Sequence, residues 1–178
     1  YKRQVYYCLA RFDDALEAYS KSLDIKIKVV GHDSPQVAVT HTNMGVAYGR
    51  QGDHENAHSQ FQKALDISMS VVGSNHPDVA KAYVNLAWIN MKQGNEIECK
   101  AHLGNALQTN FLWMAKSFLQ SDQVFEPVRD EAWFCELLDS ANATSEVQTH
   151  AAMALSELSN GNVRKQTAVL EAGGIPLF

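Results

Sequence analysis

The sequence predicts an all-α protein built as an α-solenoid of antiparallel helix pairs. Three observations lead to this fold class. The chain repeats itself at one fixed offset, helix start and stop signals recur at the same points of each repeat, and apolar residues fall at helical spacing between those signals. A helix pair of this kind cannot bury its apolar face alone, so neighbouring pairs must stack to form one continuous core.

The repeat is visible when the chain is compared with itself at the offset that aligns Ala15 with Ala57 and Leu65 with Leu107. The alignment extends through the linkers and the helix ends: Val29–Gly31 with Val71–Gly73, Pro35 with Pro77, and Gln51–Gly52 with Gln93–Gly94. A single register held over this length identifies a tandem array rather than a chance similarity.

The two helices of the best-defined repeat can be located from their end signals. Ser34 is positioned as the N-cap of the first helix, Pro35 as its first residue and Gly52 as a left-handed stop. Asp53 then caps the second helix. The apolar stripe of the second helix follows the spacing i, i+4, i+7, i+8: Ala57, Phe61, Ala64 and Leu65.

Small side chains are expected where these two helices meet. Gly45 and Ala57 allow the backbones to approach closely, while Tyr48 and Phe61 fill the space around them. The contact is therefore predicted to be dense and to tolerate no enlargement of Ala57.

These residues carry a family resemblance. The pattern of Met44–Gly45, Tyr48, Gly52, Ala57, Phe61 and Ala64 resembles the tetratricopeptide repeat, and a weaker copy follows in Leu86–Ala87, Gly94, Cys99, Leu103 and Ala106. The spacing of about 42 residues and the linkers VVGHDSPQVA and VVGSNHPDVA are similar to the longer variant found in kinesin light chains and nephrocystin-like proteins. The resemblance covers roughly residues 1–110, which we take as a first domain of tetratricopeptide-like repeats.

After Asn110 the register is lost, and residues 111–140 are predicted to form a helical transition or capping segment. The expected elements are a helix from Leu112 to about Gln120, a turn near Pro127 and a helix from about Asp130 to Asp139.

Residues 141–178 change character and resemble an armadillo repeat that is truncated at its C-terminus. The resemblance rests on the Gly173–Gly174–Ile175–Pro176 junction and on a helix with a face of Ala151, Ala152, Leu155 and Leu158. Asn162 is expected to cap a further helix that ends near Ala172. Peptide-clamping armadillo units carry a Trp and an Asn where this chain has Met153 and Glu157, which argues against a clamp for basic nuclear signals.

The composition excludes several classes of protein. With 46% hydrophobic and 20% charged residues the chain is not a disordered tail, and its longest apolar stretches are too short for a membrane-spanning helix. The net charge of −5 gives no general attraction to nucleic acid, so we expect neither nucleic-acid binding nor membrane insertion.

The three cysteines lack a C-x-x-C pair and indicate a reducing, cytoplasmic compartment, where association with the cytoskeleton is an option. Cys99 replaces the alanine of the repeat and is predicted to be a small core residue, while Cys135 is placed on an apolar face. No phosphate-binding loop, nucleophile elbow or paired carboxylates are found, so we expect no catalytic residues and no cofactor.

One motif points elsewhere. His54–Glu55–Asn56–Ala57–His58 reads H-E-x-x-H, in which two His one helical turn apart bind zinc and Glu acts as the base. A third ligand is required, and the metzincin continuation fails because Phe61 and Ala64 replace Gly and His. The alignment places the string at the start of a solenoid helix with both His on its solvent face, so we predict no metal. A downstream carboxylate of the thermolysin type would complete a site, which keeps a zinc hydrolase open.

The family geometry implies that the first helix of each unit lines a concave groove. The positions expected to be exposed there are Val39, Asn43, Val46 and Arg50 in one unit and Lys81, Asn85, Trp88 and Lys92 in the next. Asn side chains can bond the N–H and C=O groups of a bound peptide, and the Arg and Lys residues favour a peptide with Asp or Glu. The alternative is structural: Asn43 and Asn85 join neighbouring repeats, and the cations stabilise helix C-termini.

The sequence therefore predicts a non-enzymatic scaffold that binds a partner's peptide or helix in a concave helical groove. The resemblance to kinesin light chains implies adaptor or cargo recognition. The alternative is a fragment of an enzyme, either a zinc hydrolase at His54, Glu55 and His58 or a chain whose catalytic domain lies outside these residues. A third interpretation, a co-chaperone that clamps a C-terminal carboxylate, is disfavoured because both units lack the Lys, Gly-Asn and Tyr-Lys pattern of that subgroup.

Overall fold

The computed structural model of the chain describes the backbone of residues 2–159 and the side chains of residues 11–143, 145–147 and 149. All regular structure in this part of the chain is helical, which confirms the predicted all-α solenoid. The elements are α1 (Lys2–Val30), α2 (Pro35–Gln51), α3 (His54–Val72), α4 (Pro77–Lys92), α5 (Glu96–Gln108), the 3-10 helix η1 (Leu112–Ala115), α6 (Lys116–Ser121), the 3-10 helix η2 (Gln123–Val128) and α7 (Ala132–Ser159).

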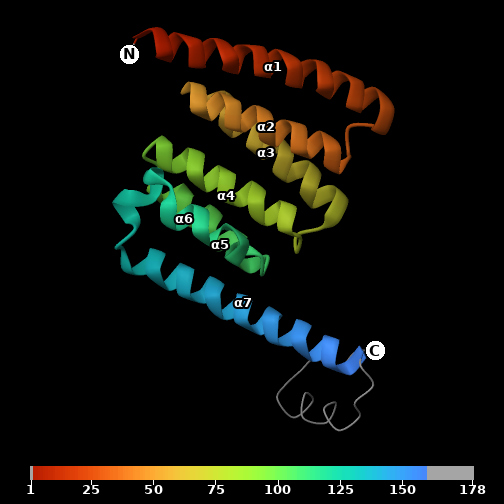
Figure 1. Ribbon diagram of the computed structural model, residues 1–178, viewed down its shortest axis with the longest axis vertical. Helices are drawn as coiled ribbons and strands as arrows, with labels where there is room; N and C mark the ends of the chain where they lie inside the picture. Colours follow the sequence, from red (N-terminus) through yellow and green to blue (C-terminus); the bar gives the residue numbers. More distant parts are fainter. Residues whose placement is uncertain (1, 160–178) are drawn as a thin grey trace.

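The helices are stacked along the long axis of the molecule, with α1 at one end, α7 at the other, and α5 and α6 at about the same level between α4 and α7 (Figure 1). Each of the helices α1 to α5 packs mainly against its neighbours in sequence, and α7 packs against α5 and η1. None of the described helices combines the length and apolar character needed to cross a membrane.

The predicted end signals of α2 and α3 are confirmed. The Ser34 hydroxyl accepts a hydrogen bond from the Val37 N–H at 3.3 Å, and Gly52 ends α2 in the left-handed region with φ of 92°. Asp53 caps α3 by accepting from the Asn56 N–H at 3.1 Å. The helix signals in the sequence therefore set where α2 begins and ends and where α3 begins.

Close approach of these helices depends on glycine. A Cβ atom on Gly45 would lie 2.6 Å from the Phe61 ring, which is fully buried between the helices, and Ala57 is fully buried as well. A Cβ atom on Gly49 would lie 2.6 Å from the Trp88 ring of α4. The two glycines thus allow aromatic rings from α3 and α4 to rest directly on the α2 backbone.

Helix α1 is continuous through the point where a repeat should turn. Ala10 and Arg11 stand where the next unit has Gly52 and Asp53, so the left-handed stop and the N-cap are both missing. With neither signal present, one helix of 29 residues forms in place of two.

The segment after Asn110 differs from the prediction. The helix expected from Leu112 starts as the 3-10 helix η1 and continues as α6, and Pro127 lies within the 3-10 helix η2 rather than in a turn. The predicted helix end at Asp139 is wrong, because α7 runs unbroken to Ser159. Residues 132–159 contain neither Gly nor Pro, so nothing in them stops a helix.

The boundary expected between residues 140 and 141 therefore falls inside α7, where no helix end marks it. The backbone at Ala151, Ala152, Leu155 and Leu158 is helical as expected. Their side chains, those of Met153 and Glu157, the helix capped by Asn162 and the Gly173–Gly174 junction lie outside the described part of the chain.

Candidate functional site: a groove of two repeat-related pockets

Two pockets lie at equivalent positions of the two repeats. The α2–α4 pocket is lined by Pro35, Ala38, Val39, Thr42, Asn43, Ser68, Val71, Val72, Asp78 and Lys81. The α4–α6 pocket is lined by Pro77, Ala80, Lys81, Val84, Asn85, Phe111, Met114, Ala115 and Phe118. One wall of each pocket is made by equivalent residues. Five residues of α2 form it in the α2–α4 pocket, and the five residues of α4 that align with them form it in the α4–α6 pocket. Lys81 borders both, so the pockets are neighbours on the two sides of this side chain, and the two together are called the groove below.

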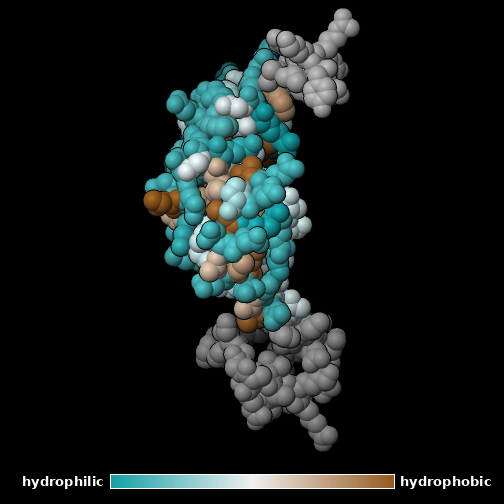
Figure 2. All heavy atoms as spheres, turned by 90° about the vertical axis from the view of Figure 1, so that its left-hand side faces the viewer, coloured by the Kyte–Doolittle hydropathy of each residue, from teal (hydrophilic) through white to brown (hydrophobic). Residues whose placement is uncertain are grey.

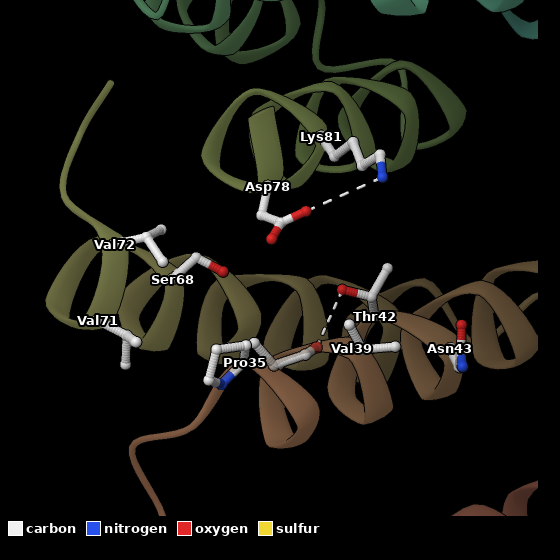
Figure 3. A pocket seen from close by; sticks show the side chains of 10 residues that line it. Pro35, Val39, Thr42, Asn43, Ser68, Val71, Val72, Asp78 and Lys81 are labelled. Carbon is white, nitrogen blue, oxygen red and sulfur yellow. Dashed lines mark hydrogen bonds and ion pairs between the residues drawn. The ribbon is translucent and has the colours of Figure 1, made fainter. Parts of the chain in front are cut away.

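The α2–α4 pocket has polar walls. Figure 3 shows the side-chain oxygens of Thr42, Ser68 and Asp78 directed into the space between α2, α3 and α4. Thr42 Oγ1 donates its own hydrogen to the Ala38 carbonyl at 3.1 Å, which leaves its lone pairs free to accept. Lys81 Nζ lies 3.9 Å from Asp78 Oδ1, so the charge of the carboxylate is partly balanced at the rim.

The α4–α6 pocket has apolar walls. Val84 stands where the first pocket has Thr42, and the opposite wall is made by Phe111, Met114 and Phe118. Met114 and Phe118 are 50% and 39% exposed, which is unusual for large apolar side chains on a short helical segment. Phe118 is held in place by an edge-on contact with the buried ring of Phe125, with centroids 6.0 Å apart.

The chain reverses direction after α5, and this reversal positions the apolar wall of the α4–α6 pocket. Asn110 adopts the left-handed region with φ of 60°, and Thr109 Oγ1 both donates to the Ala106 carbonyl at 2.6 Å and accepts from the Phe111 N–H at 3.3 Å. The chain is thereby turned so that η1 and η2 pack beside α4 and α6 packs against η1, where the array would otherwise continue with the first helix of another repeat.

The predicted groove residues are divided by the structure. Val39, Asn43, Lys81 and Asn85 line the two pockets. Val46, Arg50 and Lys92 lie further along α2 and α4, outside the pockets; Arg50 and Lys92 are exposed and Val46 is half-buried. Seven of the eight predicted positions are thus at least partly accessible on the first helices.

Trp88 is the exception, and the prediction that it is exposed is wrong. Its side chain is 8% exposed, because the ring rests on Gly49 and meets the edge of Phe61 with centroids 6.5 Å apart. Lys92 Nζ lies 4.9 Å from the Trp88 ring centroid and covers it from the solvent side. The sequence held the signal for this burial, since Gly49 leaves room for a large ring on the neighbouring helix.

The H-E-x-x-H string lies in the first turns of α3 as predicted, but its two His side chains are half-buried rather than on an open solvent face. His58 lies close enough to His102 of α5 for its charge to lower the pKa of His102, an effect second to that of burial. Within the part of the chain that the structure describes, no three His, Cys, Asp or Glu side chains gather as a metal site requires. The zinc-hydrolase alternative therefore gains no support.

The cysteines differ from one another. Cys99 is fully buried, and burial raises the pKa of its thiol to about 12, which suits a small core residue and not a nucleophile. Cys135 is exposed in the first turn of α7, with its thiol 3.6 Å from the Arg129 carbonyl, so its placement on an apolar face is wrong. The helix begins with Ala132 and turns Phe134 inward instead.

Sequence reasoning missed the aromatic wall of the second pocket. Phe111, Met114 and Phe118 follow the last repeat and have no counterpart in the alignment, so periodicity carried no signal for them. Thr42 and Asp78 were missed for another reason: only the packing of α2 against α3 and α4 brings them to one pocket.

Comparison with known proteins agrees with the repeats. Residues 4–70 match the family model described as tetratricopeptide repeat. Repeats of this family are generally non-enzymatic modules for protein–protein interaction. A search of the curated proteins finds no match.

A solved structure shares the fold. The crystal structure of BtubC (BKLC) from P. vanneervenii aligns with a TM-score of 0.61 and 19% sequence identity, over 79% of this chain and 59% of that chain. The present chain therefore spans little more than half of that protein, and at this level of identity the likeness shows a shared fold.

Proposed function

We propose that the chain is an interaction scaffold that binds an extended segment or helix of a partner protein along the groove of α2, α4 and α6. The observation that carries the proposal is the repetition of one pocket at two equivalent repeat positions, with Lys81 shared between them. Such repetition suits a ligand that is itself a linear chain.

The polar groups along the groove support a peptide ligand with acidic residues. Asn43 and Asn85 occupy the same place in each repeat, and each amide can satisfy both an N–H and a C=O group of a bound backbone. Arg50 and Lys92 stand about 10 Å further along their helices, seven residues on, and make that end of the groove basic in a protein of net charge −5. Their main effect would be on the rate of encounter.

The finer family assignment belongs to this proposal. Gly31 and Gly73 follow the second helices and Gly52 and Gly94 the first, all four at positive φ, in pairs separated by the repeat offset. This regularity supports the longer repeat variant of kinesin light chains and nephrocystin-like proteins, and with it an adaptor or cargo role in the cytoplasm. We retain residues 1–110 as the repeat domain, residues 111–140 as its cap and residues 141–178 as an armadillo-like unit.

The test is a screen of random linear peptides against the wild type and two double variants. Arg50→Glu with Lys92→Glu should slow association with acidic peptides several-fold at low salt, and the difference should shrink as salt is added. Asn43→Ala with Asn85→Ala should instead speed dissociation, because bound backbone groups lose their partners.

The matched control is Lys28→Glu with Lys63→Glu, which changes the net charge equally at exposed positions of α1 and α3 outside the pockets. Lys92 also covers Trp88, so its reversal is expected to cost about 0.5–1 kcal/mol of stability, and the unfolding midpoint is measured alongside. Selected peptides that bind the wild type and all three double variants equally would remove the groove as the binding site.

A further inference from the structure

We infer that the groove recognises two side chains of its ligand: an uncharged hydrogen-bond donor binds in the α2–α4 pocket and a large apolar side chain binds in the α4–α6 pocket. This inference rests on the proposed function and adds to it the chemistry of the partner segment. It follows from the difference between two pockets that the repeat makes equivalent in position but not in chemistry.

The size of each pocket fits one side chain. Their volumes are about 200 and 220 Å³, below the roughly 300–1,000 Å³ of pockets that enclose whole small molecules. The pockets lie on either side of α4, so their centres are separated by about the 10 Å width of a helix. An extended chain covers that distance in two to four residues at about 3.3 Å per residue.

The α2–α4 pocket presents acceptors to its occupant. Asp78 is a carboxylate, and the Thr42 hydroxyl has already donated its hydrogen to the Ala38 carbonyl, so both oxygens face the pocket as acceptors (Figure 3). A cationic side chain would meet Lys81, whose ammonium is 3.9 Å from the Asp78 carboxylate. Ser, Thr, Asn and Gln supply a donor without that repulsion.

The α4–α6 pocket lacks these acceptors. Val84 replaces Thr42 at the equivalent position, and no carboxylate is among the residues that line this pocket. Phe111, Met114 and Phe118 enclose the space from the other side. The polar groups on its lining are the Lys81 ammonium and the Asn85 amide of α4, so a polar side chain directed at the opposite wall would lose hydrogen bonds to water, whereas Leu, Ile, Met or Phe would cover exposed apolar surface there.

Figure 2 shows how hydrophobic residues are distributed over one face of the molecule. The face that it shows is largely hydrophilic, with hydrophobic residues in separate patches. The exposed apolar residues at the second pocket, Met114 and Phe118, are likewise confined to one short segment.

The experiment exchanges the chemistry of the pockets through two nearly isosteric substitutions, Thr42→Val and Val84→Thr. The same peptide library is selected on wild type and on each variant. Wild type should select a donor and a large apolar residue two to four positions apart. Thr42→Val should weaken the preference for a donor about two- to tenfold and leave the preference for an apolar residue unchanged. Val84→Thr should weaken the preference for an apolar residue and leave the preference for a donor unchanged.

The control for the first substitution is Thr42→Ser, which keeps the hydroxyl and should keep the donor preference. If either exchange lowers the unfolding midpoint, the peptides are varied instead. Ser→Ala and Leu→Ala changes in a selected ligand should each weaken binding to wild type. The Ser→Ala change should cost less affinity against Thr42→Val than against wild type, because the Thr42 acceptor is gone and the Asp78 acceptor is left. If wild type, Thr42→Val and Val84→Thr all select peptides with the same residue preferences, the two-pocket inference is overturned, while the proposed binding of peptides in the groove stands. Failure of wild type to select any peptide would overturn both.

Discussion

The two complete repeat units share a backbone but not their internal contacts. In the α2–α3 unit His41 Nδ1 and Gln60 Oε1 are hydrogen-bonded at 2.7 Å. The equivalent residues of the α4–α5 unit, Tyr83 and His102, make a tilted ring contact with centroids 6.1 Å apart, and the buried Nδ1 atom of His102 has no hydrogen-bond partner. The helix signals thus specify the same pair of helices twice, while the side chains between them decide how well polar groups are satisfied.

The caps differ in the same way. Asp53 and Asn95 have nearly the same backbone angles, with φ, ψ of −84°, 79° and −88°, 72°. Asp53 accepts from the Asn56 N–H, whereas Asn95 makes no cap hydrogen bond and donates to Gln93 Oε1 at 3.5 Å. Equivalent backbone positions therefore need not contribute equally to the free energy of unfolding. Substitutions at equivalent positions of the two units can measure the difference.

The largest effect is expected where the two units are most alike. Ala57 and Cys99 are equivalent and both fully buried between their helices, so Ala57→Leu and Cys99→Leu should each overpack the pair and cost about 1–3 kcal/mol. Urea denaturation measures both losses. The exposed Ala101→Leu is the control and should cost less than about 0.5 kcal/mol. A loss at Ala57 no greater than that of the control would contradict the packing described for α2 and α3.

The caps should separate the units more clearly. Asp53→Ala should lower stability by about 0.5–2 kcal/mol because α3 loses an accepting oxygen at its N-terminus, while Asn95→Ala should change little. Asp53→Asn keeps an acceptor and should recover most of the loss. Thermal unfolding of the three variants provides the comparison, and equal losses at Asp53 and Asn95 would show that the caps are equivalent after all.

The same cap has an expected dependence on pH. Hydrogen bonds from the Asn56 side chain and backbone hold the pKa of the Asp53 carboxyl below its ordinary value of 3.8. A carboxyl with a lowered pKa in the folded state stabilises the protein above pH 3.8 and loses that contribution as the pH falls through its folded pKa. The stability difference between wild type and Asp53→Ala should therefore narrow in acid.

The smallest effect is expected from the ring contact that replaces a hydrogen bond in the second unit. Burial first, and the charge of His58 second, lower the pKa of His102 from 6.5, against an opposing effect of Glu98. The unfolded chain then binds a proton at His102 more readily than the folded one. The contribution of His102 to the free energy of unfolding is therefore fully present above about pH 6.5 and is lost as the pH drops below it. His102→Gln, which restores the residue found in the first unit, should reduce this fall in urea denaturation at pH 7.5 and 5.5. An unchanged fall would assign the pH dependence to other groups.

Much of the fold could be predicted because its signals are local. Ser34, Gly52 and Asp53 act within one helical turn of their own positions, and the stripe through Phe61 follows from helical spacing alone. Where such a signal was absent, the prediction failed: the helix end set at Asp139 was inferred from a change in composition, and composition does not stop a helix.

The sequence by itself determined the repeat, the ends of α2 and the start of α3, and the buried stripe of α3, since these depend on spacing and on residues a few positions apart. Only the tertiary structure decided which residues meet across helices. It buried Trp88 on Gly49, brought Thr42 and Asp78 to one pocket and set Phe118 against α4. The physical reason is that close packing depends on the shapes of side chains far apart in the chain, and one glycine on α2 determines where a ring from α4 can lie.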